Sequence, residues 1–410
     1  MMKVKDSGVS YIGNIPISWY TKKIKYVAVE CSESGLMNPK ESQYIGLENI
    51  VGYSNRIIVT NTEYELSIQK KCYKDNILFG KLRPYLSKVI IAPYDGFCTG
   101  EFLELTKYKG DIRFLRYSLL NANLIDTINM STYGAKMPRA NSEFIMNCYI
   151  AYPTYNEQKI ISDFLDTKCK EIDALSMDIQ AEIDTLEEYK RSVIIEKVTK
   201  GLNPDVRMKD SGLEWLGEIP DKWRLSRIGS VYELRNLKVS DKDYIPLSVT
   251  KKGVVPQLET AAKTNAHDDR KLVKKGDFVI NSRSDRRGSC GISSYEGSVS
   301  LINTILAPLG EMNPRYYDWL FHTIQFGDEF YKWGHGIVDD LWTTNWWDMK
   351  KITIPVPDLE KQEKIASFLD EKCAEIDSII ETKKEQLTIL DEYKKAIIYE
   401  YVTGKKEVSV

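Results

Sequence analysis

The stretch from Glu157 to Thr199, EQKIISDFLDTKCKEIDALSMDIQAEIDTLEEYKRSVIIEKVT, decides the fold of this chain. It contains no proline and no glycine, and apolar residues recur in it every seven positions, at Leu165, Ile172, Ile179, Leu186 and Val193. Ile161, Leu175, Ile183 and Tyr189 fill adjacent positions of the same stripe. The pattern predicts one helix, roughly 65 Å long, whose single apolar face needs a partner.

The chain supplies that partner itself, because the sequence repeats with a period of 204 residues. Phe164-Leu165-Asp166 returns as Phe368-Leu369-Asp370, and Glu188-Tyr189-Lys190 returns as Glu392-Tyr393-Lys394. The second stripe consists of Leu369, Ile376, Leu390 and Ile397, is interrupted by Lys383, and is supported by Ile379, Ile380 and Leu387. We expect the helices to pair as an antiparallel coiled coil, although a two-helix dimerisation hairpin would show the same heptads.

The segments that open each repeat are also alike, whereas the residues that follow them diverge. Lys5-Asp6-Ser7-Gly8 recurs as Lys209-Asp210-Ser211-Gly212, and Trp19 recurs as Trp223. The copies then differ until they rejoin at Pro153 and Pro357. The sequence therefore predicts globular domains at 1–153 and 205–356 and spacer helices at 154–204 and 357–410. A duplicated domain whose halves merely drifted apart would give the same pattern.

The two divergent segments have the local patterns of α+β domains. Short β-like runs occur at 88–91 and 277–280, and short amphipathic helical patterns occur at 111–121 and 315–325. We expect two globular α/β domains separated by two long antiparallel coiled-coil helices, in a circular arrangement with pseudo-two-fold symmetry. In that arrangement the C-terminus lies near the Lys5–Trp19 segment.

Composition and motif searches exclude several classes of protein. Apolar residues make up 42% and charged residues 28% of the chain, and no signal peptide or membrane-length apolar run is found, which predicts a cytoplasmic protein. The seven cysteines form no CxxC pair, and the three histidines have no metal-ligand spacing. There is no P-loop and no GxSxG, and Asn313-Pro314-Arg315-Tyr316 lacks the second proline of an amino-methyltransferase motif. We expect a binding protein without a catalytic or metal site.

Charge is distributed unevenly along a chain whose net charge is only −2. The globular segments carry +5 and +1, whereas each spacer segment carries −4. Loops rich in Arg, Lys and Asn can address phosphates and base edges, although a solvated surface loop has the same composition. The candidate DNA-binding residues are Lys81, Arg83, Tyr85, Lys88, Lys136, Arg139 and Asn141 in the first domain, and Asn281, Arg283, Arg286, Arg287 and Trp342 in the second.

Taken together, these segments resemble the specificity subunit of type I restriction-modification systems over essentially the whole length of the chain. The resemblance rests on the opening segment Lys5-Asp6-Ser7-Gly8, Ile15-Pro16 and Trp19 with its repeat, and on Tyr44-Ile45-Gly46-Leu47-Glu48-Asn49-Ile50. It also rests on Leu78-Phe79-Gly80-Lys81-Leu82-Arg83-Pro84-Tyr85, Glu101-Phe102-Leu103 and Lys136-Met137-Pro138-Arg139.

The resemblance implies two target recognition domains, each reading one half of a bipartite, asymmetric site in double-stranded DNA. It implies that the spacer helices set the gap and dock two methyltransferase subunits, and it allows for restriction-translocase subunits. S-adenosylmethionine, ATP and Mg²⁺ would then belong to the partner subunits, and this chain would hold no cofactor and carry out no catalysis. The stripe residues Leu165, Ile172, Ile179, Leu186, Val193, Leu369, Ile376, Leu390 and Ile397 would form the helix pair and partner-docking surface.

The second domain departs from the family pattern, because it lacks the Phe79-to-Pro84 and Met137-to-Arg139 motifs of the first and has Asn281-Ser282-Arg283-Ser284-Asp285-Arg286-Arg287 instead. We therefore expect a different recognition subtype and two different half-sites. The alternatives are a coiled-coil interaction scaffold or a DNA-binding repressor without a methyltransferase partner, and an enzyme with an unrecognised nuclease site.

Overall fold

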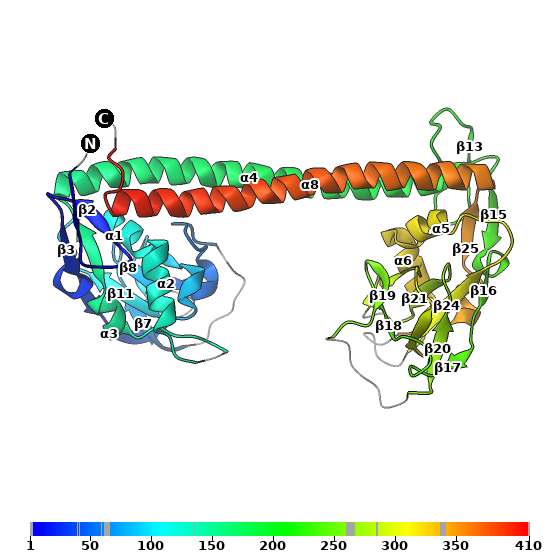
Figure 1. Ribbon diagram of the computed structural model, residues 1–410, viewed down its shortest axis with the longest axis horizontal. Coiled ribbons are helices and arrows are strands. Elements are labelled where there is room, and N and C mark those ends of the chain that lie inside the picture. The colour runs from blue at the N-terminus through cyan, green and yellow to red at the C-terminus, as the bar shows by residue number, and fades with distance from the viewer. Residues whose placement is uncertain are drawn as a thin grey trace. The chain divides into compact units, whose positions relative to one another are not determined.

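The computed structural model describes residues 3–38, 40, 42–58, 60, 66–134, 136–259, 267–283, 286–336 and 342–408 (Figure 1). The chain forms two compact units. The first unit consists of Met1–Gln180 and Lys384–Val410, and the second unit consists of Ala181–Lys383. Each unit contains one globular domain and one half of each long helix.

The two long helices are α4 (Tyr155–Lys200) and α8 (Leu359–Val402). In the first unit they are joined by an ion pair between Asp173 and Lys394, with 2.5 Å between Oδ1 and Nζ. In the second unit Lys190 Nζ pairs with Asp377 at 2.6 Å, and Lys383 pairs with Glu182. In the first unit the ring of Phe164 on α4 also lies 4.4 Å from that of Tyr401 on α8. In both units residue numbers rise along one helix as those of their partners fall along the other, so the predicted antiparallel pairing is confirmed within each unit.

Burial along the helices corrects part of the predicted stripe. Most residues of the seven-residue series are buried, whereas Leu186 and Leu390 are half-buried. Leu175 and Tyr189, expected in the stripe, are each 49% exposed, and Ile379 is 40% exposed. The buried second row lies four residues after the first, at Cys169, Ile183, Cys373 and Ile380. On a helix, the residues three and four positions after a given residue lie on opposite sides of it. In this helix pair the cysteine and isoleucine residues four positions on are buried, whereas the apolar residues three positions on, such as Leu175, are exposed.

The domain of the first unit contains two four-stranded sheets. One has the order β4 (Val29–Cys31), β11 (Phe102–Thr106), β8 (Ile77–Gly80), β9 (Val89–Ile91). The other has the order β5 (Ser34–Met37), β7 (Ser67–Cys72), β10 (Gly96–Cys98), β6 (Tyr44–Ile45). Two-stranded pairs form between β1 (Val4–Asp6) and β2 (Asn14–Pro16), and between β3 (Tyr20–Lys23) and β12 (Tyr149–Tyr152). The helices are α1 (Ile112–Leu119), α2 (Ala122–Met130) and α3 (Ser142–Asn147), with short 3₁₀ turns at Ile24–Tyr26, Leu47–Asn49 and Pro84–Leu86.

The domain of the second unit repeats this topology although its sequence has diverged. Its main sheet has the order β16 (Tyr232–Leu234), β24 (Asn303–Pro308), β21 (Phe278–Asn281), β22 (Cys290–Ile292). Its second sheet has the order β17 (Lys238–Val239), β20 (Arg270–Val273), β23 (Gly297–Ser300), beside the hairpin β18 (Leu247–Thr250) and β19 (Gly253–Pro256). The outer pairs are β13 (Met208–Asp210) with β14 (Glu218–Pro220) and β15 (Arg224–Arg227) with β25 (Thr353–Val356). The helices are α5 (Pro314–Phe321), α6 (Ile324–Lys332) and α7 (Trp346–Met349), with a 3₁₀ turn at Ile228–Ser230.

The opening segment of each unit is held against the ends of the long helices. In the first unit the tail after α8 returns to this segment, where Lys405 donates to the Asn14 carbonyl and Gly404 packs against Pro16 and Trp19. The C-terminal end therefore lies beside the opening segment, as expected from the repeat. All seven cysteines are free thiols, and no helix in the described part of the chain is long and apolar enough to cross a membrane.

Candidate nucleic-acid interface

Two loops of the first domain form one continuous surface. The loop after β8 and the loop before α3 are joined by backbone hydrogen bonds from Arg83 N to Pro138 O (2.7 Å) and from Ala140 N to Lys81 O (2.9 Å). Tyr133 and Arg139 also exchange two backbone hydrogen bonds across the second loop. The structure thus brings together the Lys81–Lys88 and Lys136–Asn141 residues that the sequence singled out separately.

The second domain joins the corresponding loops by the same backbone contacts. Thr344 N donates to Ser282 O at 3.0 Å, and Thr343 and His335 exchange two backbone hydrogen bonds. These contacts make Ser282 the equivalent of Lys81, and Thr343 the equivalent of Arg139. The two domains therefore share a backbone frame at this surface but present different side chains from it.

In the first domain, Tyr85, Lys136 and Arg139 are exposed at this surface. Arg139 is also held by Glu101, with 2.8 Å between its Nε and Oε2. Lys81 and Arg83 are half-buried, and Arg83 has a φ of 51°, in the left-handed region that a β-carbon disfavours. Burial, together with the charge of Lys70, lowers the pKa of Lys81. A nearby anion would favour the charged form of this side chain.

Two of the candidate residues in the first domain have structural contacts. Lys88 Nζ donates to the Leu47 carbonyl at 2.6 Å, and burial lowers its pKa. Asn141 Oδ1 accepts from the Glu143 amide at 2.7 Å and caps the N-terminus of α3. These side chains hold the loops in place, whereas Tyr85, Lys136 and Arg139 are the ones most available to a ligand.

In the second domain, Asn281 is buried and accepts from the Arg283 amide. Arg286 and Arg287 are exposed, and Arg287 pairs with Asp328 at 2.8 Å and lies 4.9 Å from the ring centre of Tyr331. Arg283 and Trp342 are half-buried. Ser284 and Asp285 of the predicted basic loop, and the Ile337–Leu341 stretch, lie outside the described residues.

Several exposed residues at these loops were missed by the sequence analysis. Tyr133 (60% exposed) in the first domain corresponds to His335 in the second, through the shared backbone contacts described above. Trp347 in the second domain is 65% exposed, and Lys350 Nζ lies 4.1 Å from its ring centre. The one signal in the sequence for these residues is that Tyr133 lies shortly before the loop that contains Lys136, Arg139 and Asn141.

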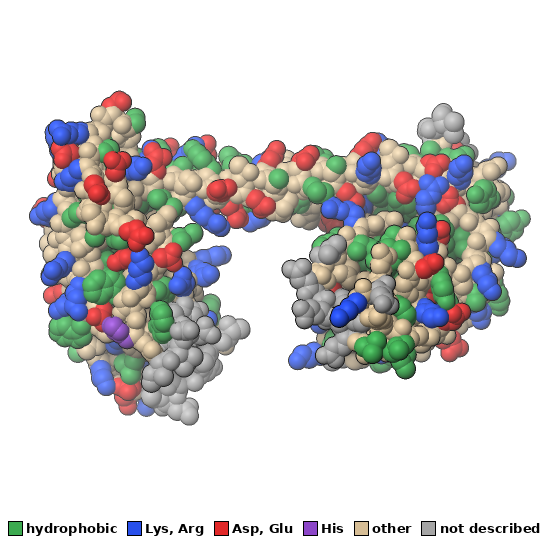
Figure 2. Space-filling model, turned by 180° about the vertical axis from the view of Figure 1, so that it is seen from behind, with side chains coloured by type: hydrophobic (Ala, Val, Ile, Leu, Met, Phe, Trp, Pro, Cys, Tyr) green, Lys and Arg blue, Asp and Glu red, His purple; other side chains and the backbone are tan. Residues whose placement is uncertain are grey.

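The surface charge of the long helices differs from that of the loops. Figure 2 shows Lys and Arg side chains mixed with Asp and Glu along α4 and α8 on the visible face, without a continuous positive band. Each spacer segment carries a net charge of −4, which does not attract the phosphates of DNA. No group of three side chains able to hold a metal ion is found in the described ranges.

Comparisons with known proteins agree on one family. The sequence model of the type I restriction modification DNA specificity domain matches the chain twice, at residues 17–185 and 220–389. A relative from Methanocaldococcus jannaschii, described as a putative type I restriction enzyme MjaX specificity subunit, is 23% identical over 97% of this chain and 96% of its own length. The specificity subunit of the Escherichia coli type I enzyme EcoDI is 28% identical, over only 22% of this chain and 20% of its own length.

Solved structures show the same fold at low sequence identity. One match is a chain from a structure that describes the structural basis of complex assembly and conformational transition of the type I R-M system. Its TM-score is 0.72 and its sequence identity is 16%, and the match covers 96% of this chain and 99% of that one. The HsdS subunit of Thermoanaerobacter tengcongensis matches with a TM-score of 0.53, 17% identity, and coverage of 96% and 98%. With the doubled family match, the chain belongs to the type I restriction-modification DNA specificity family, as a non-catalytic specificity subunit.

Proposed function

We propose that the chain reads a bipartite, asymmetric DNA site, with one half-site read by each globular domain. The observation that carries this proposal is the pair of equivalent loop surfaces, which share their backbone hydrogen bonds but differ in side chains. Base edges are distinguished by side-chain donors and acceptors, so one frame with two sets of side chains suits two different short sequences. Residues 1–153 and 205–356 are the two reading domains in this proposal.

The long helices, at 154–204 and 357–410, set the gap between the half-sites and dock two methyltransferase subunits. Two exposed apolar positions support this docking role because they recur after 204 residues. Leu175 corresponds to Ile379, and Tyr189 corresponds to Tyr393, and all four are at least 40% exposed. Each unit thus presents one exposed aliphatic residue and one exposed tyrosine, which suits two copies of one partner. The buried stripe residues hold the helix pair and are not available to it.

The cofactors of the complex follow from this division of roles. S-adenosylmethionine belongs to the methyltransferase subunits, and ATP and Mg²⁺ belong to restriction-translocase subunits where these are present. The chain itself contributes sequence recognition and spacing.

Mapping methylated adenines in the host genome tests the reading role. Replacing residues 205–356 by the corresponding domain of another family member should change one half-site and leave the other half-site and the gap intact. A change in both half-sites would contradict the two-reader proposal. Purification of the native complex without any methyltransferase would instead favour a repressor or scaffold.

The docking role has a separate test in the mass of the complex. Leu175→Glu should remove one of two methyltransferase copies, because it places a negative charge in the proposed docking surface of the first unit and leaves that of the second unit unchanged. Ile389→Glu is the matched control, since Ile389 is 63% exposed on α8 but corresponds to Thr185 in the other copy. Loss of both copies, or of neither, with Leu175→Glu would place the docking surface elsewhere.

A further inference from the structure

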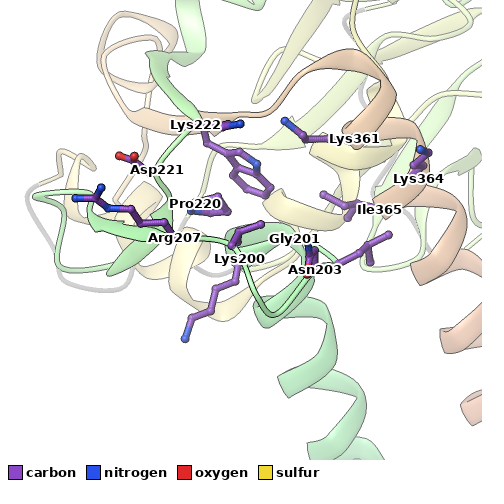
Figure 3. A pocket seen from close by; sticks show the side chains of 13 residues that line it. Lys200, Gly201, Asn203, Arg207, Pro220, Asp221, Lys222, Lys361, Lys364 and Ile365 are labelled. Atoms are coloured by element: carbon purple, nitrogen blue, oxygen red, sulfur yellow. The ribbon is translucent and has the colours of Figure 1, made fainter.

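A cavity occurs at the same place in each unit, where the opening segment meets the ends of the two long helices. The cavity of the first unit has a volume of about 620 Å³, and that of the second unit has about 550 Å³ (Figure 3). The repeat preserves three apolar residues of the lining. They are Pro16, Trp19 and Ile161 in the first unit and Pro220, Trp223 and Ile365 in the second.

The hydrogen bonding of the two tryptophans differs. In the first unit the indole N–H of Trp19 donates to Glu157 Oε1 at 3.0 Å. In the second unit the position of Glu157 is taken by Lys361, which pairs with Asp358 at 2.7 Å. Trp223 is only 4% exposed, but its indole nitrogen lies at the cavity surface, where water reaches it, and within the described part of the chain it has no protein acceptor. The cavity of the second unit therefore leaves open the place that Glu157 fills beside the indole in the first unit.

The charges around the two cavities also differ. The first cavity is lined by two lysines and two glutamates, namely Lys3, Lys406, Glu157 and Glu407. The second is lined by five cations and one carboxylate, namely Lys200, Arg207, Lys222, Lys361, Lys364 and Asp221. Figure 3 shows the Lys222 and Lys361 side chains directed toward one another at one edge, with Lys200 directed away. Lys361 and Lys364 are paired with Asp358 and Glu360, which leaves Lys200, Arg207 and Lys222 in excess over Asp221. An acceptor in the place of Glu157 is therefore favoured when it is anionic.

We propose that the cavity of the second unit binds a partner protein through a glutamate that lies next to an apolar residue. The glutamate carboxylate accepts the indole N–H of Trp223 and lies between Lys222 and Lys361. Its methylene groups, with the neighbouring apolar residue, cover Pro220 and Ile365. Glu157 demonstrates in the first unit that a glutamate side chain fits this lining and reaches the indole.

The chemistry of the lining favours a peptide over nucleic acid. A phosphate can pair with the lysines, but it brings no apolar surface to cover the proline and isoleucine side chains. Trp223 is too deeply buried to stack on a base. This site is independent of DNA reading, because none of its residues belongs to the candidate DNA-binding loops.

Indole N–H resonances of the full-length, ¹⁵N-tryptophan-labelled protein test the site directly. The probe is the peptide acetyl-Glu-Leu-Glu-Glu-amide, and its control is the same peptide with glutamine at each glutamate. Trp223→Phe and Trp19→Phe assign the two resonances. The acidic peptide should shift the Trp223 resonance and leave that of Trp19 in place, whereas the glutamine peptide should shift neither.

Lys361→Glu gives the second unit the glutamate that the first unit has at this position. It should lower the affinity for the acidic peptide roughly 10-fold or more, because the carboxylate of the new glutamate then accepts the indole N–H of Trp223. Lys361 is partly exposed, so the variant should fold, and Lys222→Ser offers a second variant that removes a cation without filling the site. An unshifted Trp223 resonance at saturating peptide overturns the proposal. So does a shift of the same size with inorganic phosphate or a DNA duplex, which would make the site a phosphate site.

Discussion

The two globular domains differ in their loops and agree in the backbone that holds them. Arg139 in one domain stands where Thr343 stands in the other, yet both residues exchange paired backbone hydrogen bonds with the equivalent neighbour, Tyr133 or His335. At these loops the side chains differ between the two domains, whereas the backbone hydrogen bonds that hold the loops are shared. This division allows recognition to change without loss of the fold.

The repeated helices show the opposite behaviour, since the same residues meet in both units. Asp173 pairs with Lys394 in the first unit, and the equivalent Asp377 pairs with Lys190 in the second. The surroundings differ, however, because the Lys394 side chain is 6% exposed and the Lys190 side chain is 25% exposed. Identical residues should therefore contribute unequally to stability.

The largest expected effect is a difference in the stability that is lost when each of these two ion pairs is broken. Asp173→Ala should destabilise the first unit by about 3 kcal/mol, because it leaves a buried ammonium without its counter-charge. Asp377→Ala should cost about 0.5 kcal/mol, because water solvates Lys190 once its partner is removed. Amide hydrogen exchange in α4 and α8 measures the local free energy of opening in each variant. Equal losses in both variants would show that the difference in burial does not govern these pairs.

A smaller effect is expected where the loops differ. Arg139→Ala should weaken DNA binding, or relax one half-site, by about 1–3 kcal/mol if its guanidinium contacts a base. Thr343→Ala, at the equivalent position of the second domain, should change affinity by about 0.5 kcal/mol or less. Titration of duplexes carrying single substitutions in each half-site measures both.

Arg139→Ala also leaves Glu101 unpaired, and that carboxylate would repel DNA. The double variant Arg139→Ala with Glu101→Gln separates the two causes. If the double variant binds like the unmodified protein, the loss in the single variant came from Glu101 and not from a missing base contact.

The repeat made the helices and their pairing predictable, because identical residues at a constant spacing require identical local structure. The contact face was harder to predict, since Leu175 and Cys169 are both apolar and only the pairing geometry decides that Cys169 is buried and Leu175 exposed. The frame shared by the loops was not predictable from sequence. It depends on backbone hydrogen bonds between residues such as Lys81 and Ala140, which lie far apart in the chain and leave no pattern in side chains.

The smallest expected effect concerns Glu157 of the first unit, whose position in the second unit is taken by Lys361. Glu157 accepts hydrogen bonds from Trp19 and from the amide and hydroxyl of Thr154. Burial alone would raise the pKa of Glu157, but these hydrogen bonds outweigh burial and lower it below its ordinary value of 4.5. The ionised carboxylate therefore stabilises the folded state at neutral pH, and this stabilisation is lost as the pH falls through the lowered pKa.

Glu157→Gln should accordingly destabilise the first unit by about 1 kcal/mol at neutral pH, because a neutral amide oxygen is a weaker acceptor. The difference from the unmodified protein should shrink as the solution is acidified below the ordinary glutamate pKa, since both proteins then lack the charge. Glu363→Gln, at an exposed glutamate of α8 in the second unit, is the control and should show no comparable narrowing, because within the described part of the chain no hydrogen bond is lost with its carboxylate. Urea unfolding at a series of pH values measures both variants, and a difference for Glu157→Gln that stays constant into acid would assign the role of Glu157 to shape and not to charge.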